Sequence, residues 1–280
     1  MAIPFLKMHG AANDFVVIDH RHTFLPADVS VLVRQWCDRR RGVGADSVLL
    51  LERSHVADAA MRYFNADGGA ADYCGNGARC MARYALDLGL GHAGRVVLET
   101  AVGLQQGQRS GAAIEIHFGR VAAPSEPLVV EACGRSFSGR TVTAGVPHFV
   151  VEAELLERVD LAAWGSGLRH HERFGAGGAN VDFVSRRGAG VVAMRTYERG
   201  VEGETLACGS GAIASALWAA ASGAPAPVRV ETAGGDELIV GFTQHEDAYD
   251  VTLTGPAEVA FRGEWREAGE VAPAAAQGGS

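Results

Sequence analysis

Two segments with helical periodicity dominate the pattern of hydrophobic and polar positions along the chain. In residues 75–89 the apolar positions recur every three or four residues, as on one face of a helix, and Gly89 marks the end of the pattern. Residues 209–223 are apolar on nearly every side, up to Gly223. Because a helix that is apolar all round is buried, we expect the second helix to lie inside a sheet.

The other apolar runs are short, which is typical of strands. Strands are predicted at residues 15–18, 48–51, 59–64, 114–118 and 191–197, further apolar segments lie at 145–151 and 177–185, and helical patterns cover 29–39 and about 153–164. Neither half of the chain has the alternation of strands and helices that a βαβ series requires. We therefore predict an α+β fold with largely antiparallel or mixed sheets, each wrapped round one principal helix.

The two helical segments belong to an internal repeat. Cys74 and Cys208, which directly precede them in Cys-Gly-Asn-Gly-Ala and Cys-Gly-Ser-Gly-Ala, are 134 residues apart. The same offset pairs Tyr63 with Tyr197 without a gap, and VVLETAVG after the first helix resembles VRVETAGG after the second, with a two-residue slip. Self-similarity over such a period indicates a duplicated unit.

The length and the repeat together predict two domains. A chain of 280 residues is long enough for two. We place the first at residues 1–118 and the second at 119–256, with the proline-containing stretch 119–127 as the crossing between them. Residues 267–280, EAGEVAPAAAQGGS, are expected to form a disordered tail.

Composition and charge exclude several classes of partner. A net charge of −8, with a pI near 5.7 and no long basic run, argues against nucleic acid or an anionic membrane. No stretch approaches the ~18 apolar residues of a membrane helix. The start, MAIPFLKMHG, lacks the features of a signal peptide, so we expect a cytoplasmic protein with reduced thiols. Cys37, Cys80 and Cys133 are interpreted as structural.

A cysteine at a helix N-terminus favours reactions that involve an anion. Unpaired backbone N–H groups and the positive end of the helix dipole favour negative charge there, so we expect the setting to lower the thiol pKa. One such cysteine is as consistent with a buried structural thiol as with a catalytic one, but the repetition favours catalysis. Two thiols facing one cleft suit racemisation or epimerisation, in which one sulfur removes a proton from a carbon and the other returns one on the opposite face.

The charge that develops on such a carbon requires positive potential nearby. The backbone N–H groups of Gly75, Asn76, Gly209 and Ser210 would supply it from both helix ends. The sequence contains no phosphate-binding glycine loop of the standard kinds and no spacing of His and carboxylates typical of a metal site. We therefore expect an enzyme that uses neither a cofactor nor a metal.

Three motifs relate the chain to a known family. FNADG…CGNGARC, ERGxxxxTxACGSGA and HGxxNDF closely resemble diaminopimelate epimerase, and the resemblance extends from residue 7 to about residue 261. It implies a pyridoxal-phosphate-independent enzyme that interconverts L,L- and meso-2,6-diaminopimelate for lysine and peptidoglycan synthesis. It also implies two pseudo-symmetric domains, a homodimer, and a last strand that returns residues 257–266 to the first domain.

The resemblance further implies a role for each matching residue. Cys74 and Cys208 would be the acid/base pair, and His148 and Glu198 would tune their pKa values. Arg199 would clamp a carboxylate at the far end of the substrate, since guanidinium binds that group bidentately. The substrate-binding positions would be Asn13, Ser47, Asn65, Gly75, Asn76, Asn180, Arg199, Gly209 and Ser210.

Two positions depart from the family pattern and leave alternatives open. Val146 stands where the family often has Asn, and Ser47 where many members carry Gln, which affects the far half of the substrate. A related racemase or epimerase of histidine, glutamate or hydroxyproline is therefore an alternative, and a thiol redox switch or an amino-acid-binding relative is a non-enzymatic one. Simpler structural interpretations are surface ion pairing for Arg199, turn positions for Asn65 and Asn180, and a structural turn for His148.

Overall fold

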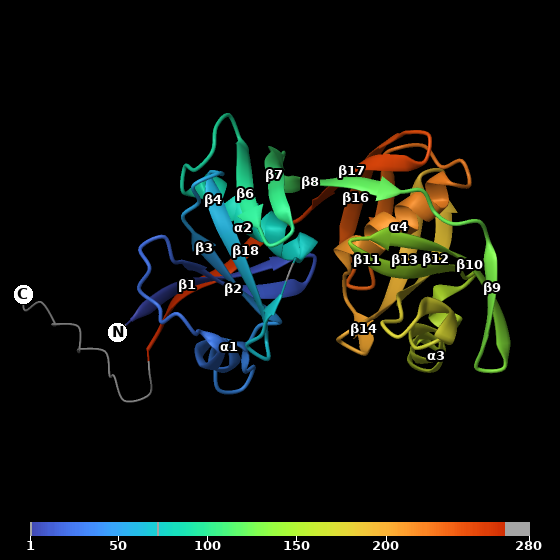
Figure 1. Cartoon of the computed structure of the whole chain (residues 1–280), viewed down its shortest axis with the longest axis horizontal. Helices are drawn as coiled ribbons and strands as arrows, with labels where there is room; N and C mark the ends of the chain where they lie inside the picture. Colours follow the sequence, from blue (N-terminus) through green and yellow to red (C-terminus); the bar gives the residue numbers. More distant parts are fainter. Residues whose placement is uncertain (1, 72, 267–280) are drawn as a thin grey trace, which may run out of the picture.

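Two lobes lie side by side in the structure, a computed structural model that describes residues 2–71 and 73–266 (Figure 1). Each lobe is built around one helix, α2 (Gly75–Asp87) in the first and α4 (Gly209–Ala220) in the second. Strands wrap both helices, and the predicted α+β class is confirmed.

The remaining elements are distributed over the two lobes as follows. The first lobe contains β1 (Ile3–Gly10), β2 (Asn13–Asp19), α1 (Ser30–Cys37), β3 (Ser47–Glu52), β4 (Ala59–Asn65), β5 (Ala70–Ala71), β6 (Arg95–Thr100), β7 (Gly103–Ser110) and β18 (Glu258–Trp265). The second contains β9 (Leu128–Ala132), β10 (Arg135–Ala144), β11 (Val146–Glu152), η1 (Leu156–Arg158), η2 (Leu161–Gly165), α3 (Ser166–Arg169), η3 (Glu172–Phe174), β12 (Asn180–Gly188), β13 (Val191–Glu198), β14 (Gly203–Thr205), β15 (Val228–Glu231) and β16 (Glu237–Gln244). β8 (Ala113–Ala122) and β17 (Ala248–Gly255) connect the lobes.

The pairing of strands in the first lobe is repeated in the second. β1 pairs antiparallel with β2, β2 parallel with β3, β3 antiparallel with β4, and β4 parallel with β6. β10, β11, β12, β13 and β15 pair in the same order and with the same directions. β18 extends the first sheet beyond β1 as β9 extends the second beyond β10. The repeat in the sequence therefore corresponds to a duplicated strand-and-helix unit.

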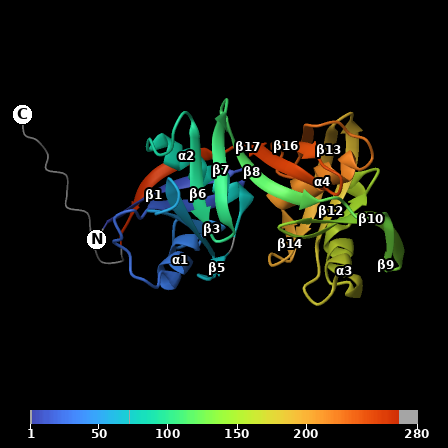
Figure 2. The ribbon, with the colours of Figure 1, turned by 45° about the horizontal axis from the view of Figure 1, so that its top comes forward.

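β8 and β17 form a continuous antiparallel pair between the two lobes (Figure 2). The pairing runs from Ile114 opposite Gly255 to Ala122 opposite Ala248. The sequence predicted a strand that ends at Phe118 and a crossing that begins at residue 119. Instead, hydrogen bonds to β17 carry β8 past Phe118 to Ala122, so a strand makes the crossing.

The hydrophobic core of each lobe surrounds its helix. Ala78, Met81 and Ala82 of α2 are fully buried against strands of the first lobe. α4 is buried on nearly all sides, as the pattern predicted, with Leu217 and Trp218 in the core of the second lobe. Because apolar burial is the main favourable term in folding, these two cores fix where each helix begins. Among the described residues, no helix has the length and apolar character needed to cross a bilayer.

Some elements differ from the sequence-based expectation. The segment near 153–164 is not one helix but the separate turns η1 and η2. The reason is that Arg195 Nη1 donates hydrogen bonds to the carbonyl oxygens of Leu156 and Val159, at 2.9 and 3.1 Å. β7 was missed because its sequence, GLQQGQRS, is too polar to show an apolar pattern, although it is paired on both sides by β6 and β8. The predicted tail at 267–280 lies outside the described residues.

Candidate active site

Cys74 and Cys208 occupy equivalent N-cap positions in the two lobes. Each has an extended backbone, with φ of −142° and −121°, and each precedes the first turn of its helix. The sulfur of Cys74 accepts a hydrogen bond from the Gly77 N–H at 3.4 Å, and that of Cys208 accepts one from Gly211 at the same distance. Both thiols therefore occupy the place of a capping oxygen, at the positive end of a helix.

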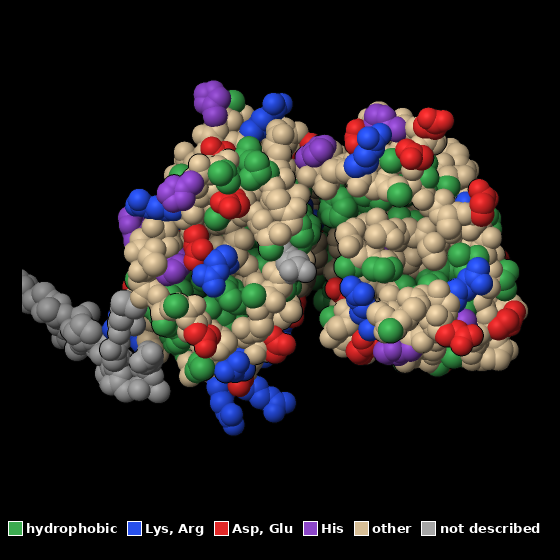
Figure 3. Space-filling view, in the orientation of Figure 1, with side chains coloured by type: hydrophobic (Ala, Val, Ile, Leu, Met, Phe, Trp, Pro, Cys, Tyr) green, Lys and Arg blue, Asp and Glu red, His purple; other side chains and the backbone are tan. Residues whose placement is uncertain are grey.

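The two helix N-termini converge at the junction of the lobes. A Cβ on Gly209 would lie 3.4 Å from Asn76 Oδ1, at the start of the other helix. The same Leu253 methyl group lies 3.6 Å from a Cβ placed on Gly75 and 3.2 Å from one placed on Gly209. In the space-filling view the surface is hollowed between the two lobes (Figure 3). The two capping cysteines thus lie at one junction, although they come from separate cores.

The expectation that the helix N-termini lower the thiol pKa values is wrong. Burial raises the pKa of Cys74, and it raises that of Cys208, which is 5% exposed, well above the ordinary value. The negative charge of Glu198 raises both further, while hydrogen bonds from Gly77 and Gly211 lower them. Desolvation outweighs the helix ends because a thiolate loses more hydration than two or three N–H groups return. Both sulfurs are therefore protonated thiols at neutral pH.

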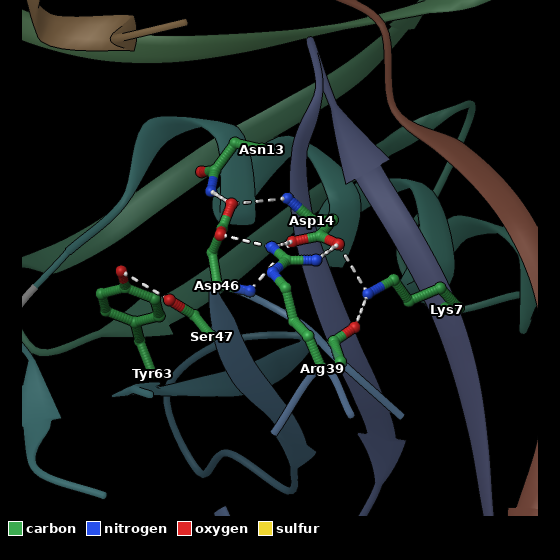
Figure 4. Close-up of polar contacts among 8 residues, drawn as sticks. Lys7, Asn13, Asp14, Arg39, Asp46, Ser47 and Tyr63 are labelled. Carbon is green, nitrogen blue, oxygen red and sulfur yellow. Dashed lines mark hydrogen bonds and ion pairs between the residues drawn. The ribbon is translucent and has the colours of Figure 1, made fainter. Parts of the chain in front are cut away.

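Asn13 lies directly beside Cys74. Its Oδ1 accepts hydrogen bonds from the Cys74 thiol at 3.5 Å and from Asn76 Nδ2 at 3.3 Å. Its Nδ2 donates to Asp46 Oδ2 at 2.8 Å (Figure 4). A carboxylate can only accept hydrogen bonds, so Asp46 fixes which end of the Asn13 carboxamide faces the thiol. The structure therefore brings Asn13 to the sulfur of Cys74.

Asp46, the partner of Asn13, belongs to a network of ion pairs that holds its carboxylate in place. Arg39 Nη2 contacts Asp46 Oδ1 at 2.7 Å and Asp14 Oδ1 at 2.8 Å, and Asp14 Oδ2 lies 2.7 Å from Lys7 Nζ (Figure 4). The guanidinium of Arg39 and the ammonium of Lys7 hold the pKa of Asp14 well below its ordinary value, against the effect of burial. Charge-assisted hydrogen bonds of this kind are short and strong, so they fix the geometry of both carboxylates.

Arg79, in the first turns of α2, is a fully buried cation. Its Nη2 donates to Asn76 Oδ1 at 2.9 Å and its Nε to the Pro256 carbonyl at 3.3 Å. Its Nη1 has no hydrogen-bond partner within residues 2–71 and 73–266, and no carboxylate of those residues forms an ion pair with it. Its positive charge lowers the pKa of Cys74 in opposition to burial. This arginine both orients Asn76 and adds positive potential at the first thiol.

The surroundings of Cys208 are built differently, as a chain of side chains. The Cys208 sulfur lies 3.4 Å from Ser210 Oγ, and Ser210 Oγ lies 3.0 Å from His148 Nε2. His148 Nδ1 is 2.7 Å from Asp182 Oδ2, and both side chains are completely buried. Thr196 Oγ1 donates to the other oxygen of Asp182 at 2.7 Å. His148, expected to tune a thiol, therefore reaches Cys208 through Ser210.

Glu198 acts on both thiols from a distance. Thr205 Oγ1 donates to its Oε2 at 2.8 Å, and burial raises the Glu198 pKa above the ordinary value. Its charge contributes to the raised pKa values of Cys74 and of Cys208. The site therefore contains a carboxylate that both halves share.

The residues expected to hold the far end of the substrate are placed less closely together. Asn180 is buried, accepts from the Arg199 backbone N–H at 2.7 Å and contacts His148 Nε2 at 3.3 Å. Asn65 is exposed at the end of β4. The Arg199 guanidinium forms no ion pair with any residue that the structure describes. Ser47 Oγ is 3.1 Å from Tyr63 Oη, so its hydroxyl already has a partner.

Sequence reasoning missed several residues that shape the site. Asp182 was read only as part of the segment 177–185, although a carboxylate within a buried strand is a signal for a buried partner. Arg79 falls within the predicted helix 75–89, but the pattern did not indicate its burial. Tyr63, whose pKa burial raises, was seen only as a repeat position. Asp46 follows a glycine turn and gave no sign that it orients Asn13.

The fold is shared with structures of known proteins. The PhzF-family phenazine biosynthesis protein of Bacillus anthracis matches with a TM-score of 0.72 at 15% identity, over 95% of this chain and 99% of that one. A hydroxyproline epimerase from Agrobacterium vitis, with bound trans-4-hydroxy-L-proline, matches with a TM-score of 0.69 at 20% identity, over 94% and 92%. The duplicated lobes of this chain thus share the α+β fold of these proteins.

Sequence comparison identifies the family within this fold. The sequence model described as diaminopimelate epimerase matches residues 5–120 and 140–259. The diaminopimelate epimerase of Aquifex aeolicus is 37% identical, over 94% of this chain and 98% of the relative, and that of Desulforudis audaxviator is 39% identical, over 93% and 98%. The chain belongs to the diaminopimelate epimerase family, and it is an epimerase.

Proposed function

We propose that this chain interconverts L,L- and meso-2,6-diaminopimelate by proton transfer at one α-carbon, without a cofactor. The observation that carries the proposal is the convergence of two helix N-termini, each capped by a cysteine. Family membership supports the substrate, and the mirrored caps support a mechanism with one thiol on each face of the carbon. Lysine and peptidoglycan synthesis are the pathways that such a product would supply.

The reaction balances with two sulfurs alone. One cysteine first loses its S–H proton to solvent; the Cα–H bond then breaks as its proton passes to that thiolate, and the electron pair remains on the substrate as an enediolate. The S–H bond of the other cysteine then breaks as its proton goes to Cα on the opposite face. The N–H groups of Gly75, Asn76, Gly209 and Ser210 hold the reacting carboxylate, and a preorganised donor of this kind typically lowers a barrier by about 3–4 kcal/mol.

Other residues complete the proposed site. Asn13, Ser47, Asn65, Asn180 and Arg199 bind the rest of the substrate. The Arg199 guanidinium, which forms no ion pair within residues 2–71 and 73–266, supports a carboxylate clamp at the distal end. His148 and Glu198 tune the thiols, and the contact of His148 with Ser210 and the charge of Glu198 on both sulfurs support that role.

The organisation of the enzyme is also part of the proposal. The two domains comprise residues 1–118 with 257–266 and residues 119–256, and the pairing of β18 with β1 supports the assignment of the last strand to the first domain. We propose a homodimeric, cytoplasmic enzyme whose partner is a small amino-acid substrate, with no nucleic-acid or membrane partner.

Deuterium incorporation at Cα in heavy water tests the function. The native chain should wash label into L,L- and meso-diaminopimelate, and each single variant, Cys74→Ala and Cys208→Ala, should lose turnover by about 10²–10⁴-fold while keeping the native circular dichroism spectrum. An active single variant would contradict the two-thiol mechanism.

A panel of histidine, glutamate and hydroxyproline in the same assay separates the neighbouring activities. Val146 and Ser47 are the residues that make this panel necessary, because both lie at positions expected to contact the distal half of the substrate. Labelling of one of these amino acids in preference to diaminopimelate would move the assignment to a different amino acid. Absence of labelling with all of them would favour a binding protein or a thiol redox switch.

A further inference from the structure

Asp182 is a buried carboxylate behind the second thiol to which the proposed reaction gives no role. It lies on β12, where a Cβ added to Gly211 would stand 2.6 Å from its Oδ1, so it is packed against the first turn of α4. It is completely buried and has two side-chain partners, His148 at 2.7 Å and Thr196 at 2.7 Å. Burying a charge is costly unless its partners compensate for lost hydration, so the pairing with His148 calls for a functional explanation.

Hydrogen bonding determines which nitrogen of His148 carries the proton. The Arg199 backbone N–H, which can only donate, bonds to Asn180 Oδ1 at 2.7 Å. The Asn180 amide nitrogen must therefore face His148 Nε2, 3.3 Å away, and Nε2 must accept. The proton is then on Nδ1, where the Asp182 carboxylate accepts it. Two independent partners of the ring thus require the same tautomer.

The tautomer sets the direction of the remaining hydrogen bonds. With Nε2 as an acceptor, the Ser210 hydroxyl donates to His148 across 3.0 Å. The lone pairs of Ser210 Oγ are then available to Cys208, 3.4 Å away, and the Cys208 S–H donates to them. The chain runs in one direction, from the thiol through Ser210 and His148 to Asp182. A thiol that donates in such a chain is stabilised in its protonated form.

Charges around Cys208 act in the same direction. The charged groups that act on this sulfur are Glu198 of β13 and Asp182 of β12, and both raise its pKa. The hydrogen bond that the Gly211 N–H donates to the sulfur acts against burial there. In the first half, the repeat position of Asp182 is Val48, and the charged groups that act on Cys74 are Glu198 and the cation Arg79.

We propose that Asp182 is a positioning residue that acts through His148 and Ser210 to keep Cys208 protonated, so that Cys208 is the acid in the direction in which Cys74 removes the proton. The inference rests on the proposed two-thiol function. In the step it controls, the S–H bond of Cys208 breaks, its proton goes to Cα, and the sulfur becomes a thiolate. Asp182 itself exchanges no proton with the substrate.

The variant Asp182→Asn tests this role because it keeps the size of the side chain and removes its charge. Thr196 donates to one oxygen of Asp182, which leaves the amide nitrogen of the new residue to face His148 Nδ1. A ring with its proton on Nδ1 would meet this donor, and a ring with its proton on Nε2 would meet the Asn180 amide nitrogen, so neither tautomer keeps all its hydrogen bonds. The weakened hydrogen-bond chain and the lost charge both favour the thiolate.

The measurement is alkylation of each cysteine by iodoacetamide across a pH series, followed by peptide mass spectrometry on the full chain. In Asp182→Asn the midpoint for Cys208 should fall by about one pH unit, which corresponds to about tenfold faster alkylation at a fixed pH below the midpoint. The Cys74 profile in the same sample should not move, and turnover should fall. As a control, Asp250→Asn removes an exposed charge of the same lobe, paired with His245, and should leave both profiles unchanged.

An unshifted Cys208 profile in folded Asp182→Asn would overturn the proposal and leave Asp182 as a polar core residue. If the variant does not fold, nitrogen NMR of His148 in the native chain decides, and protonation of Nε2 instead of Nδ1 would overturn the proposal. Neither readout uses diaminopimelate. A chain that shows the Cys208 shift but does not epimerise diaminopimelate would therefore contradict the proposed function while supporting the positioning role.

Discussion

The two halves of the site share one backbone plan but differ in charge. Cys74 and Cys208 cap their helices with the same geometry and the same 3.4 Å hydrogen bond from the backbone. Near Cys74 the buried charge is the cation Arg79, whose repeat position in the other half is Ile213. Near Cys208 it is the anion Asp182, whose repeat position is Val48.

The difference suggests how a duplicated fold makes an enzyme that is not symmetric. Duplication supplies two helix N-termini at one junction, which is what access to both faces of a carbon requires. Later substitutions at buried positions beside the caps make one thiol easier to ionise than the other. Because the substrate itself has two different configurations at the reacting carbon, we infer that the two thiols need not be equal. Each of the following predictions tests this difference between the two halves.

Replacing Arg79 by Met should have the largest effect. The variant removes the buried cation beside Cys74, so the pKa of that thiol should rise further, and turnover should fall by about 10²-fold, the loss typical of one electrostatic contact in a site. Stability should change little, since removal of an unpaired buried charge is favourable but Asn76 Oδ1 and the Pro256 carbonyl lose their donor. The cysteine alkylation profiles and urea unfolding measure the two effects separately.

The same variant also distinguishes a functional from a structural arginine. Cys208 belongs to the other half and serves as the internal control, so its alkylation profile should stay in place. Lower stability together with an unmoved Cys74 profile would indicate that Arg79 serves packing, through Asn76 and the Pro256 carbonyl, rather than the potential at the thiol.

Replacing Glu198 by Gln should affect both halves together. Its charge raises the pKa of Cys74 and of Cys208, so both alkylation midpoints should move to lower pH, each by less than one unit. A shift of only one thiol would show that Glu198 is not the shared carboxylate. The double variant with Asp182→Asn should move Cys208 further than either change alone and should leave Cys74 where Glu198→Gln puts it.

The sequence was sufficient to predict the duplicated fold with its two capping cysteines, but not the difference in buried charge between the two halves. The repeat, both capping cysteines and the α+β class could be predicted because they depend on local pattern and spacing. The roles of Asp182 and Arg79 could not, since burial of a charged side chain depends on strands and helices distant in the chain. The thiol pKa values were predicted in the wrong direction, because the helix end is visible in the sequence and the loss of solvent is not.

Replacing Asp46 by Asn should have a smaller effect, limited to the first half. Asp46 fixes the Asn13 carboxamide, and an amide at position 46 can present either a donor or an acceptor to it. We expect turnover to fall by only a few-fold, since Asn76 Nδ2 still bonds to Asn13 Oδ1. Steady-state kinetics should detect the change, and Arg40→Gln, an exposed neighbour, should not reproduce it. A shift of the Cys208 alkylation profile in Asp46→Asn would contradict the expectation that the effect is limited to the first half.

The smallest predicted effect concerns stability in alkali and a thiol away from the site. Burial raises the pKa of Cys80, on α2, to about 12, whereas the matching position of α4 is Ala214. A raised folded-state pKa contributes stability that is present below the unfolded pKa of about 8.5 and is lost as the pH rises from there toward the folded value. Between pH 8 and 10 this loss amounts to about 2 kcal/mol.

Cys80→Ala, which makes the first helix resemble the second at this position, removes the titrating group. Urea unfolding of both chains at pH 8, 9 and 10 should therefore give a shallower decline for the variant, by about 2 kcal/mol over the range. At pH 8 the free energy of unfolding of the variant is already lower because a buried sulfur is lost. Only the slope of this free energy against pH reports on ionisation of the thiol. Parallel declines would mean that Cys80 ionises in the folded chain as readily as in the unfolded one, and would show that the buried cation Arg79 offsets the effect of burial on this thiol.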